Sequence, residues 1–160
     1  MNIAASGIII FSVVFDQLTK LWAADVLKNG SSIKILGNFL CFTYAENKGA
    51  AFSILQNQRI FFLIITILML IFLGYIYFKT KNISNLSKLS IAMISGGAIG
   101  NFIDRLRLGY VVDFIDVRFG SFYNFPVFNI ADSFVVCGTF LMIILILFNK
   151  FETSEGNERI

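Results

Sequence analysis

Two aspartates, Asp113 and Asp132, stand out in a chain whose side chains are mostly hydrocarbon. Each lies at the edge of an apolar stretch long enough to cross a bilayer, where a carboxylate is costly unless it faces protein or water. Two neighbouring carboxylates do not both ionise easily, so the pair holds one proton over a range of pH. The ionised member can take a proton from water while the protonated member donates to a carbonyl under attack. The pair therefore predicts water activation of the aspartic-protease kind.

The composition places this pair in a membrane protein. Of the 160 residues, 57% are hydrophobic and 14% are charged, and the mean hydropathy is +0.78. A soluble domain of this composition would expose large apolar patches, so the bilayer is its natural solvent. At roughly 20 residues per span, the length allows about four spans and leaves no room for a separate soluble domain.

Several other chemistries are excluded by the residue types present. The chain contains no histidine, which removes Ser-His-Asp and Cys-His nucleophile systems and histidine metal sites. Cys41 and Cys137 are far apart and form no CxxC motif, so we expect no metal and no cofactor, and we interpret both as small core residues. The net charge of +3 is not concentrated in any stretch basic enough for a nucleic-acid surface.

The apolar stretches predict a single domain, residues 1–150, of an all-α membrane protein with four transmembrane helices. The spans are expected at about 3–24, 60–78, 89–108 and 129–148. We expect the first span to be retained, because it lacks the basic start and the cleavage site of a signal peptide. A polar tail, residues 151–160, follows the last span and is expected to be mobile.

A short β-hairpin is predicted at about residues 32–44. Two β-rich runs, 33–36 and 39–44, flank Gly37 and Asn38, which are typical of a two-residue hairpin turn. Strands exposed to lipid would leave backbone groups unpaired, so we expect a small sheet outside the hydrocarbon. A further strand is expected within 109–128, where Asp116 and Arg118 alternate and are interpreted as surface residues.

An even number of spans brings both aspartates to one membrane face. Asp113 precedes the fourth span and Asp132 begins it, and the first and third spans end at the same face. Three amides fall near this face: Asn47, Asn101 and Asn129. Each could bind a substrate backbone, or act only as a helix cap or turn residue. Asn129 or Asp132 could cap the fourth span.

The remaining charges near this face have a structural interpretation. Asp16 and Lys20 are one helical turn apart, in the order that favours an ion pair. Asp104 is expected to pair with Arg105 or Arg107 as part of the scaffold.

The third span carries polar and small residues in a helical pattern. Gly97, Asn101 and Asp104 follow the spacing that puts them on one helix face. Small residues let a second helix approach closely, so this face should point into the bundle and not at lipid.

Two other functions remain open on these residues alone. A small proton-coupled transporter would use the same carboxylates as a proton relay. A non-enzymatic scaffold would leave the paired acids unexplained. Basic residues occur on both sides of the predicted spans, so the charge distribution does not fix the orientation in the membrane.

Five sequence blocks, taken together and in order, resemble the bacterial lipoprotein signal peptidases (signal peptidase II). They are Asp16-Gln17-Leu18-Thr19-Lys20, the block 46–52 (ENKGAAF), the block 96–105 (GGAIGNFIDR), the block 111–116 (VVDFID) and the block 128–133 (FNIADS). The blocks extend from the first span to the fourth.

The resemblance implies a fold and an activity. The fold is four transmembrane helices with cytoplasmic termini and a small extramembrane β-cradle on the outer face of the bacterial inner membrane. The activity is an aspartyl endopeptidase that removes the signal peptide of prolipoproteins, cleaving before a cysteine that carries a diacylglyceryl group. The implied partners are these prolipoproteins, membrane lipid and the inhibitor globomycin, with no nucleic acid, and we expect a monomer.

The resemblance also assigns roles to individual positions. Asp113 and Asp132 match the catalytic pair. Four polar positions match residues that contact substrate or inhibitor: Asn47, Asn101, Arg105 and Asn129. Five further motif positions are assigned to the scaffold: Asp16, Lys20, Gly49, Gly97 and Asp104. The segment from Asn47 to Phe52, or the residues after Asp113, is expected to close over bound substrate.

Overall fold

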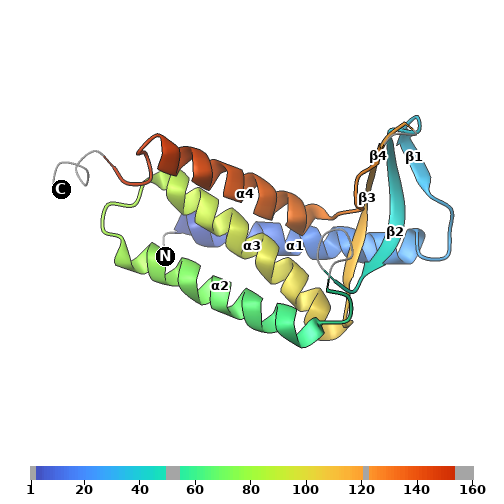
Figure 1. The fold of residues 1–160 in the computed structure, drawn as a ribbon, viewed down its shortest axis with the longest axis horizontal. Helices are drawn as coiled ribbons and strands as arrows, with labels where there is room; N and C mark the ends of the chain where they lie inside the picture. Colours follow the sequence, from blue (N-terminus) through green and yellow to red (C-terminus); the bar gives the residue numbers. More distant parts are fainter. Residues whose placement is uncertain (1–2, 50–54, 121–122, 154–160) are drawn as a thin grey trace.

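The computed structural model describes residues 3–49, 55–120 and 123–153. Four long helices form a bundle, and a small sheet lies at the end of the bundle opposite the start of α1 and the end of α4 (Figure 1). The helices are α1 (Ile3–Val26), α2 (Arg59–Lys79), α3 (Asn85–Arg107) and α4 (Ile130–Leu147). All four are long and apolar enough to cross a membrane, which confirms the predicted number of spans.

Two helix boundaries differ from the prediction in an instructive way. Helix α3 begins at Asn85, not at 89, because Ser84 caps it by accepting a hydrogen bond from the backbone nitrogen of Ser87 at 3.2 Å. The polar residues predicted to form a loop, from Ser84 onward, are therefore the N-cap and the first turn of α3. Helix α1 continues to Val26, two residues beyond the predicted end.

Helix α3 is the centre of the bundle. It packs against α1, α2 and α4, and eleven of its residues are buried, whereas in α2, which is fully described, only Leu73 is buried. Met69, Ile76 and Tyr77 of α2 pack against the same cluster as Leu73, while much of the rest of the helix is exposed, as expected for a helix at the edge of a bundle in lipid. The polar positions of α3 therefore lie inside protein, which is the environment that intramembrane charges require.

Glycines let α3 approach its neighbours, as the small-residue pattern predicts. A Cβ at Gly97 would lie 2.3 Å from the backbone oxygen of Ala131 on α4. A Cβ at Gly100 would lie 2.6 Å from Oδ2 of Asp16 on α1. Both contacts are far closer than atoms tolerate, so these two helix crossings require glycine.

The sheet has four antiparallel strands in the order β1-β2-β3-β4. They are β1 (Ile33–Leu36), β2 (Leu40–Asn47), β3 (Val111–Phe119) and β4 (Tyr123–Asn124). The predicted hairpin is confirmed as β1 and β2. The predicted two-residue turn is wrong, because Leu36 pairs with Leu40 and leaves three residues between them. Gly37 begins this turn with φ +55°, a conformation that favours glycine.

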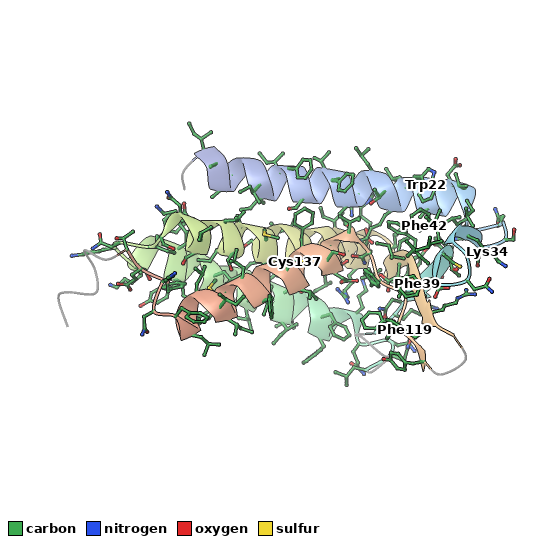
Figure 2. All side chains as sticks on the ribbon, turned by 90° about the horizontal axis from the view of Figure 1, so that it is seen from above. Trp22, Lys34, Phe39, Phe42, Phe119 and Cys137 are labelled. Carbon is green, nitrogen blue, oxygen red and sulfur yellow. The ribbon has the colours of Figure 1, made fainter. Side chains whose placement is uncertain are left out.

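Aromatic side chains attach the sheet to the bundle. Trp22 of α1 meets Phe42 of β2 edge to face, with ring centroids 5.5 Å apart (Figure 2). It also meets Phe114 of β3 at 6.2 Å. Residues on these strands are therefore held in a fixed position relative to the helices.

Three further sequence interpretations are wrong in the observed fold. Asp116 is buried, not on the surface, because Thr43 Oγ1 donates to it from β2 at 2.9 Å and Arg118 covers it from the same strand. Cys137 is exposed on α4, not in the core, whereas Cys41 is buried as expected.

The third error concerns the start of the C-terminal tail. The Ser84 nitrogen donates to the Phe151 oxygen at 3.0 Å, and the Thr153 nitrogen donates to the Asn82 oxygen at 2.8 Å. Residues 151–153 are therefore fixed against the connection between α2 and α3. The rest of the predicted tail, 154–160, lies outside the described residues.

Candidate active site

Asp113 and Asp132 come together where β3 meets the start of α4. Asp113 lies on β3 and is 2% exposed, and Asp132 lies in the first turn of α4, where the helix dipole favours an anion. The backbone nitrogens of Phe114 and Ile115 both donate to the oxygen of Phe128, at 3.0 and 2.8 Å. These bonds tie the strand to the segment that leads into the helix.

A single asparagine, Asn129, binds both carboxylates. Its Nδ2 donates to Asp113 Oδ1 at 2.6 Å, and its backbone nitrogen donates to Asp132 Oδ2 at 3.2 Å. Its Oδ1 accepts from the Asp132 nitrogen at 2.8 Å, which completes a capping box at the start of α4. Both predicted caps, Asn129 and Asp132, are thus present in one motif. Asn129 is fully buried and has no surface to offer a ligand.

Two further asparagines occupy the remaining carboxylate oxygens. Asn47 at the end of β2 donates to Asp113 Oδ2 at 3.0 Å, and Asn101 of α3 donates to Asp132 Oδ1 at 2.7 Å. All four carboxylate oxygens of the pair therefore accept a hydrogen bond. The three predicted amides converge on the two aspartates from three different elements.

The environment of Asp113 favours its protonated form. Burial in the sheet and, secondarily, the nearby Asp132 carboxylate raise its pKa to about 7, against the lowering effect of its two amide donors. At neutral pH the pair can therefore hold a single proton. This is the protonation state that acid–base catalysis by two carboxylates requires.

Arg105, which lines the groove, is bonded to Gly49 in the motif after β2. The Arg105 guanidinium donates to the Gly49 backbone oxygen at 3.1 Å and lies over the ring of Phe62, 4.8 Å from its centroid. Asn47 Oδ1 accepts from the Gly49 nitrogen at 3.0 Å. The motif after β2 is therefore fixed to the site at least as far as Gly49. The rest of the expected closing segment, 50–52, lies outside the described residues.

The charges assigned to the scaffold form one buried cluster behind the aspartates. Lys20 Nζ lies 2.8 Å from Asp16 Oδ2, which confirms the predicted pair, and 3.0 Å from Asp104 Oδ2. The predicted pairing of Asp104 with Arg105 or Arg107 is wrong, because α1 brings Lys20 to it from across the helix interface.

Gln17 belongs to this cluster and was given no role by sequence reasoning. Its Nε2 donates to Asp104 Oδ1 at 2.9 Å and to the Gly100 backbone oxygen at 3.2 Å. The sequence signal for this role is a glutamine next to an acid within an apolar span, because amide side chains inside a membrane form hydrogen bonds between helices.

A groove of about 460 Å³ runs from Asp132 along α4. Its polar end contains Asn47, Asn101, Arg105 and Asp132. Its walls are apolar and come from α4 and the segment before it: Phe125, Pro126, Val127, Phe128, Val135 and Val136. The groove also reaches Cys137, which is exposed on α4. The valine and phenylalanine residues of this wall carried no sequence signal, because apolar side chains make up 57% of the chain.

The groups at the polar end can perform acid–base chemistry on a polar bond in an otherwise apolar groove. Within the part of the chain that the structure describes, no three acidic, cysteine or histidine side chains gather as a metal site. The reacting groups that the geometry offers are the two carboxylates and the amide and guanidinium donors around them.

Comparison with known proteins identifies the family. The model of the family described as Signal peptidase (SPase) II matches residues 8–148. The chain belongs to the signal peptidase II family. A lipoprotein signal peptidase of Caldanaerobacter subterraneus subsp. tengcongensis is 48% identical over 142 residues, covering 88% of this chain and 94% of that protein. One of Staphylococcus aureus (strain Newman) is 45% identical over 153 residues, covering 95% and 91%.

Two solved structures, both of bacterial membrane enzymes studied by the in meso method, share the fold of this chain. The first has a TM-score of 0.84 at 43% identity and covers 90% of this chain and 87% of its own. The second has a TM-score of 0.81 at 43% identity and covers 90% and 92%. Family and fold together make the chain a multi-pass membrane protease, which decides against the transporter and the scaffold.

Proposed function

We propose that this signal peptidase is an aspartyl endopeptidase that removes the signal peptide of diacylglyceryl-modified prolipoproteins. The observation that carries the proposal is the attachment of Asp113 and Asp132 to one asparagine, at the end of the bundle where the helices meet the sheet. The relatives are named lipoprotein signal peptidases, which supports a prolipoprotein substrate.

In this mechanism Asp132 is the base and Asp113 is the acid. Asp132 is assigned the role of base because it lies in the first turn of α4, where the helix dipole favours an anion, and accepts hydrogen bonds from Asn101 and Asn129. Asp113 carries the proton, in keeping with its raised pKa of about 7. Asp132 takes a proton from water, the resulting hydroxide adds to the scissile carbonyl, and Asp113 protonates the carbonyl oxygen. The diol then returns a proton to Asp113, Asp132 protonates the leaving amine, and the C–N bond breaks.

The polar residues divide into those that touch substrate and those that hold the aspartates. Asn47, Asn101 and Arg105 line the groove and can donate to substrate carbonyl groups. Asn129 is buried, so we assign it to positioning the pair and not to binding substrate.

The groove suits a substrate that stays partly in the membrane. Its apolar walls on α4 would receive the signal peptide or an acyl chain laterally from lipid, while its polar end holds the peptide bond before the lipidated cysteine. The resemblance to signal peptidase II supports an inner-membrane enzyme with its active site at the outer face.

A purified-protein assay tests the reaction and the substrate class. The protein in bicelles is mixed with a prolipoprotein that carries or lacks the diacylglyceryl group, and the products are identified by mass spectrometry. We expect cleavage before the cysteine of the lipidated substrate only, inhibition by globomycin, and loss of cleavage in Asp113→Asn. Asp25→Asn, which changes an exposed carboxylate of α1, is the matched control. Full cleavage by Asp113→Asn would contradict the mechanism.

Closure of the segment after Asn47 over substrate is part of the same proposal. Hydrogen exchange of residues 47–52 is expected to slow when globomycin is bound, because their backbone groups would then be covered. Equal exchange with and without the inhibitor would argue against closure by this segment.

A further inference from the structure

The ammonium group of Lys20 makes more contacts than an ion pair needs. Lys20 is 3% exposed, and its Nζ lies 2.8 Å from Asp16 Oδ2, 3.0 Å from Asp104 Oδ2 and 2.9 Å from Asn101 Oδ1. An ammonium has three protons to donate, so all three are engaged. A buried charge with a saturated and specific set of partners is held in one geometry.

Two of these partners hold the backbone next to the catalytic aspartates. Asp16 Oδ1 accepts from the nitrogen of Ala131, immediately before Asp132, at 2.9 Å. Asp104 Oδ2 accepts from the nitrogen of Val112, immediately before the other aspartate, at 3.1 Å. The ammonium therefore joins the two carboxylates that anchor α4 and β3 at the reacting pair.

The third partner contacts Asp132 directly. Asn101 Oδ1 accepts from Lys20 Nζ at 2.9 Å and from Asn129 Nδ2 at 3.1 Å, and Asn101 Nδ2 donates to Asp132 Oδ1 at 2.7 Å. Because two donors bind Asn101 Oδ1, the Asn101 amide has one favourable orientation. With the amide reversed, its NH₂ would face an ammonium and its oxygen would face a carboxylate.

We propose that Lys20 is a positioning residue for the catalytic pair and not only a scaffold ion pair. It fixes the Asn101 amide with the nitrogen toward Asp132, and through Asp16 and Asp104 it holds the backbone before each catalytic aspartate. This inference rests on the proposed function, because it assigns Lys20 to the geometry of that reaction.

Lys20 also acts on the pair through its charge. Among the residues that the structure describes, the charged groups that act on Asp113 are Asp132 from α4, Lys20 from α1 and Arg105 from α3, while Asn47 from β2 is neutral. The Lys20 charge lowers the pKa of Asp113, in opposition to burial and to Asp132. Removal of this charge raises that pKa, so the pair keeps its proton to a higher pH.

Two substitutions separate the geometric effect from the charge effect. In Lys20→Met, we expect kcat to fall on the order of 10²-fold with KM nearly unchanged, because Asn101 and both backbone anchors are released. The alkaline limb of its pH–rate profile should move to higher pH. In Lys20→Arg, the charge remains, so the limb should stay in place. Its kcat should still fall, because a planar guanidinium does not fit three acceptors arranged around an ammonium.

Lys28→Met is the matched control, because Lys28 forms an exposed ion pair with Glu46 and its loss should leave both kcat and the limb unchanged. Emission from Trp22, which packs on Phe42 at this end of the bundle, reports whether each variant is folded. The inference is overturned if folded Lys20→Arg has the wild-type kcat. It is also overturned if the loss of kcat in Lys20→Met matches the loss of folded protein and the alkaline limb does not move. If Lys20→Met does not fold, kcat of Lys20→Arg decides alone. Normal cleavage by Asp113→Asn would instead refute the proposed function.

Discussion

Replacement of Gly97 by alanine should inactivate the enzyme without unfolding it. The new Cβ would lie 2.3 Å from the Ala131 oxygen and 2.8 Å from Val135 Cγ2, whereas ordinary contact begins at 3.4 Å. The carbonyl oxygen belongs to the backbone and cannot rotate away, so the start of α4 must move by about 1 Å. Overpacking of this kind costs about 1–3 kcal/mol. Because Asp132 is on the turn that moves, a displacement of about 1 Å is expected to lower kcat on the order of 10²-fold.

The control for this variant is Gly74→Ala on α2, where an added Cβ meets nothing within 4 Å. Both proteins would be compared by cleavage rate on a lipidated substrate and by thermal unfolding in the same detergent. We expect wild-type cleavage and unchanged or slightly raised stability for Gly74→Ala, since alanine favours helix over glycine. If folded Gly97→Ala cleaves as fast as Gly74→Ala, the argument that close packing of α3 and α4 sets the position of Asp132 is wrong.

Two further predictions follow from Asp113 and Asn129. The pKa of Asp113 is raised from 3.8 to about 7, so its contribution to the free energy of unfolding is largest below about 4 and is lost as pH rises to about 7. Asp113→Asn should flatten the pH dependence of thermal stability across that window, and an unchanged slope would contradict the assignment. Asn129→Ala should lower stability by about 0.5–2 kcal/mol through loss of the cap and should abolish cleavage, whereas Asn38→Ala in the exposed hairpin turn should change neither.

The helical part of the fold could be predicted because lipid imposes a simple pattern. Apolar runs of the right length predict α2 and α4 to within one residue at each end. The start of α3 was less predictable, since Ser84 and the polar residues after it serve equally well in a loop or in a capped helix. Hydropathy reflects how favourably a side chain transfers from water to lipid, and it carries no information about the residue that caps a helix.

The residues of the site could be predicted from the sequence better than the hydrogen bonds and ion pairs between them. Counting spans brings Asp113 and Asp132 to one face, and that expectation agrees with the observed geometry. The ion-pair partner of Asp104 could not be predicted from the sequence. Lys20 lies on another helix, and only the packing of α1 against α3 brings it close to Asp104. The same limit explains Asp116, whose burial depends on Thr43 of the adjacent strand.

The most direct test of the central claim compares Asp113→Asn, Asp132→Asn and the double variant in single-turnover cleavage of a lipidated prolipoprotein. Two carboxylates that share one proton and act on one water should be equally indispensable, so each single variant should fall by at least about 10²-fold. The double variant should then be no slower than either single variant, because groups that act as a unit are not additive. A rate in the double variant equal to the product of the two separate losses, or a single variant with nearly full activity, would contradict catalysis by this pair.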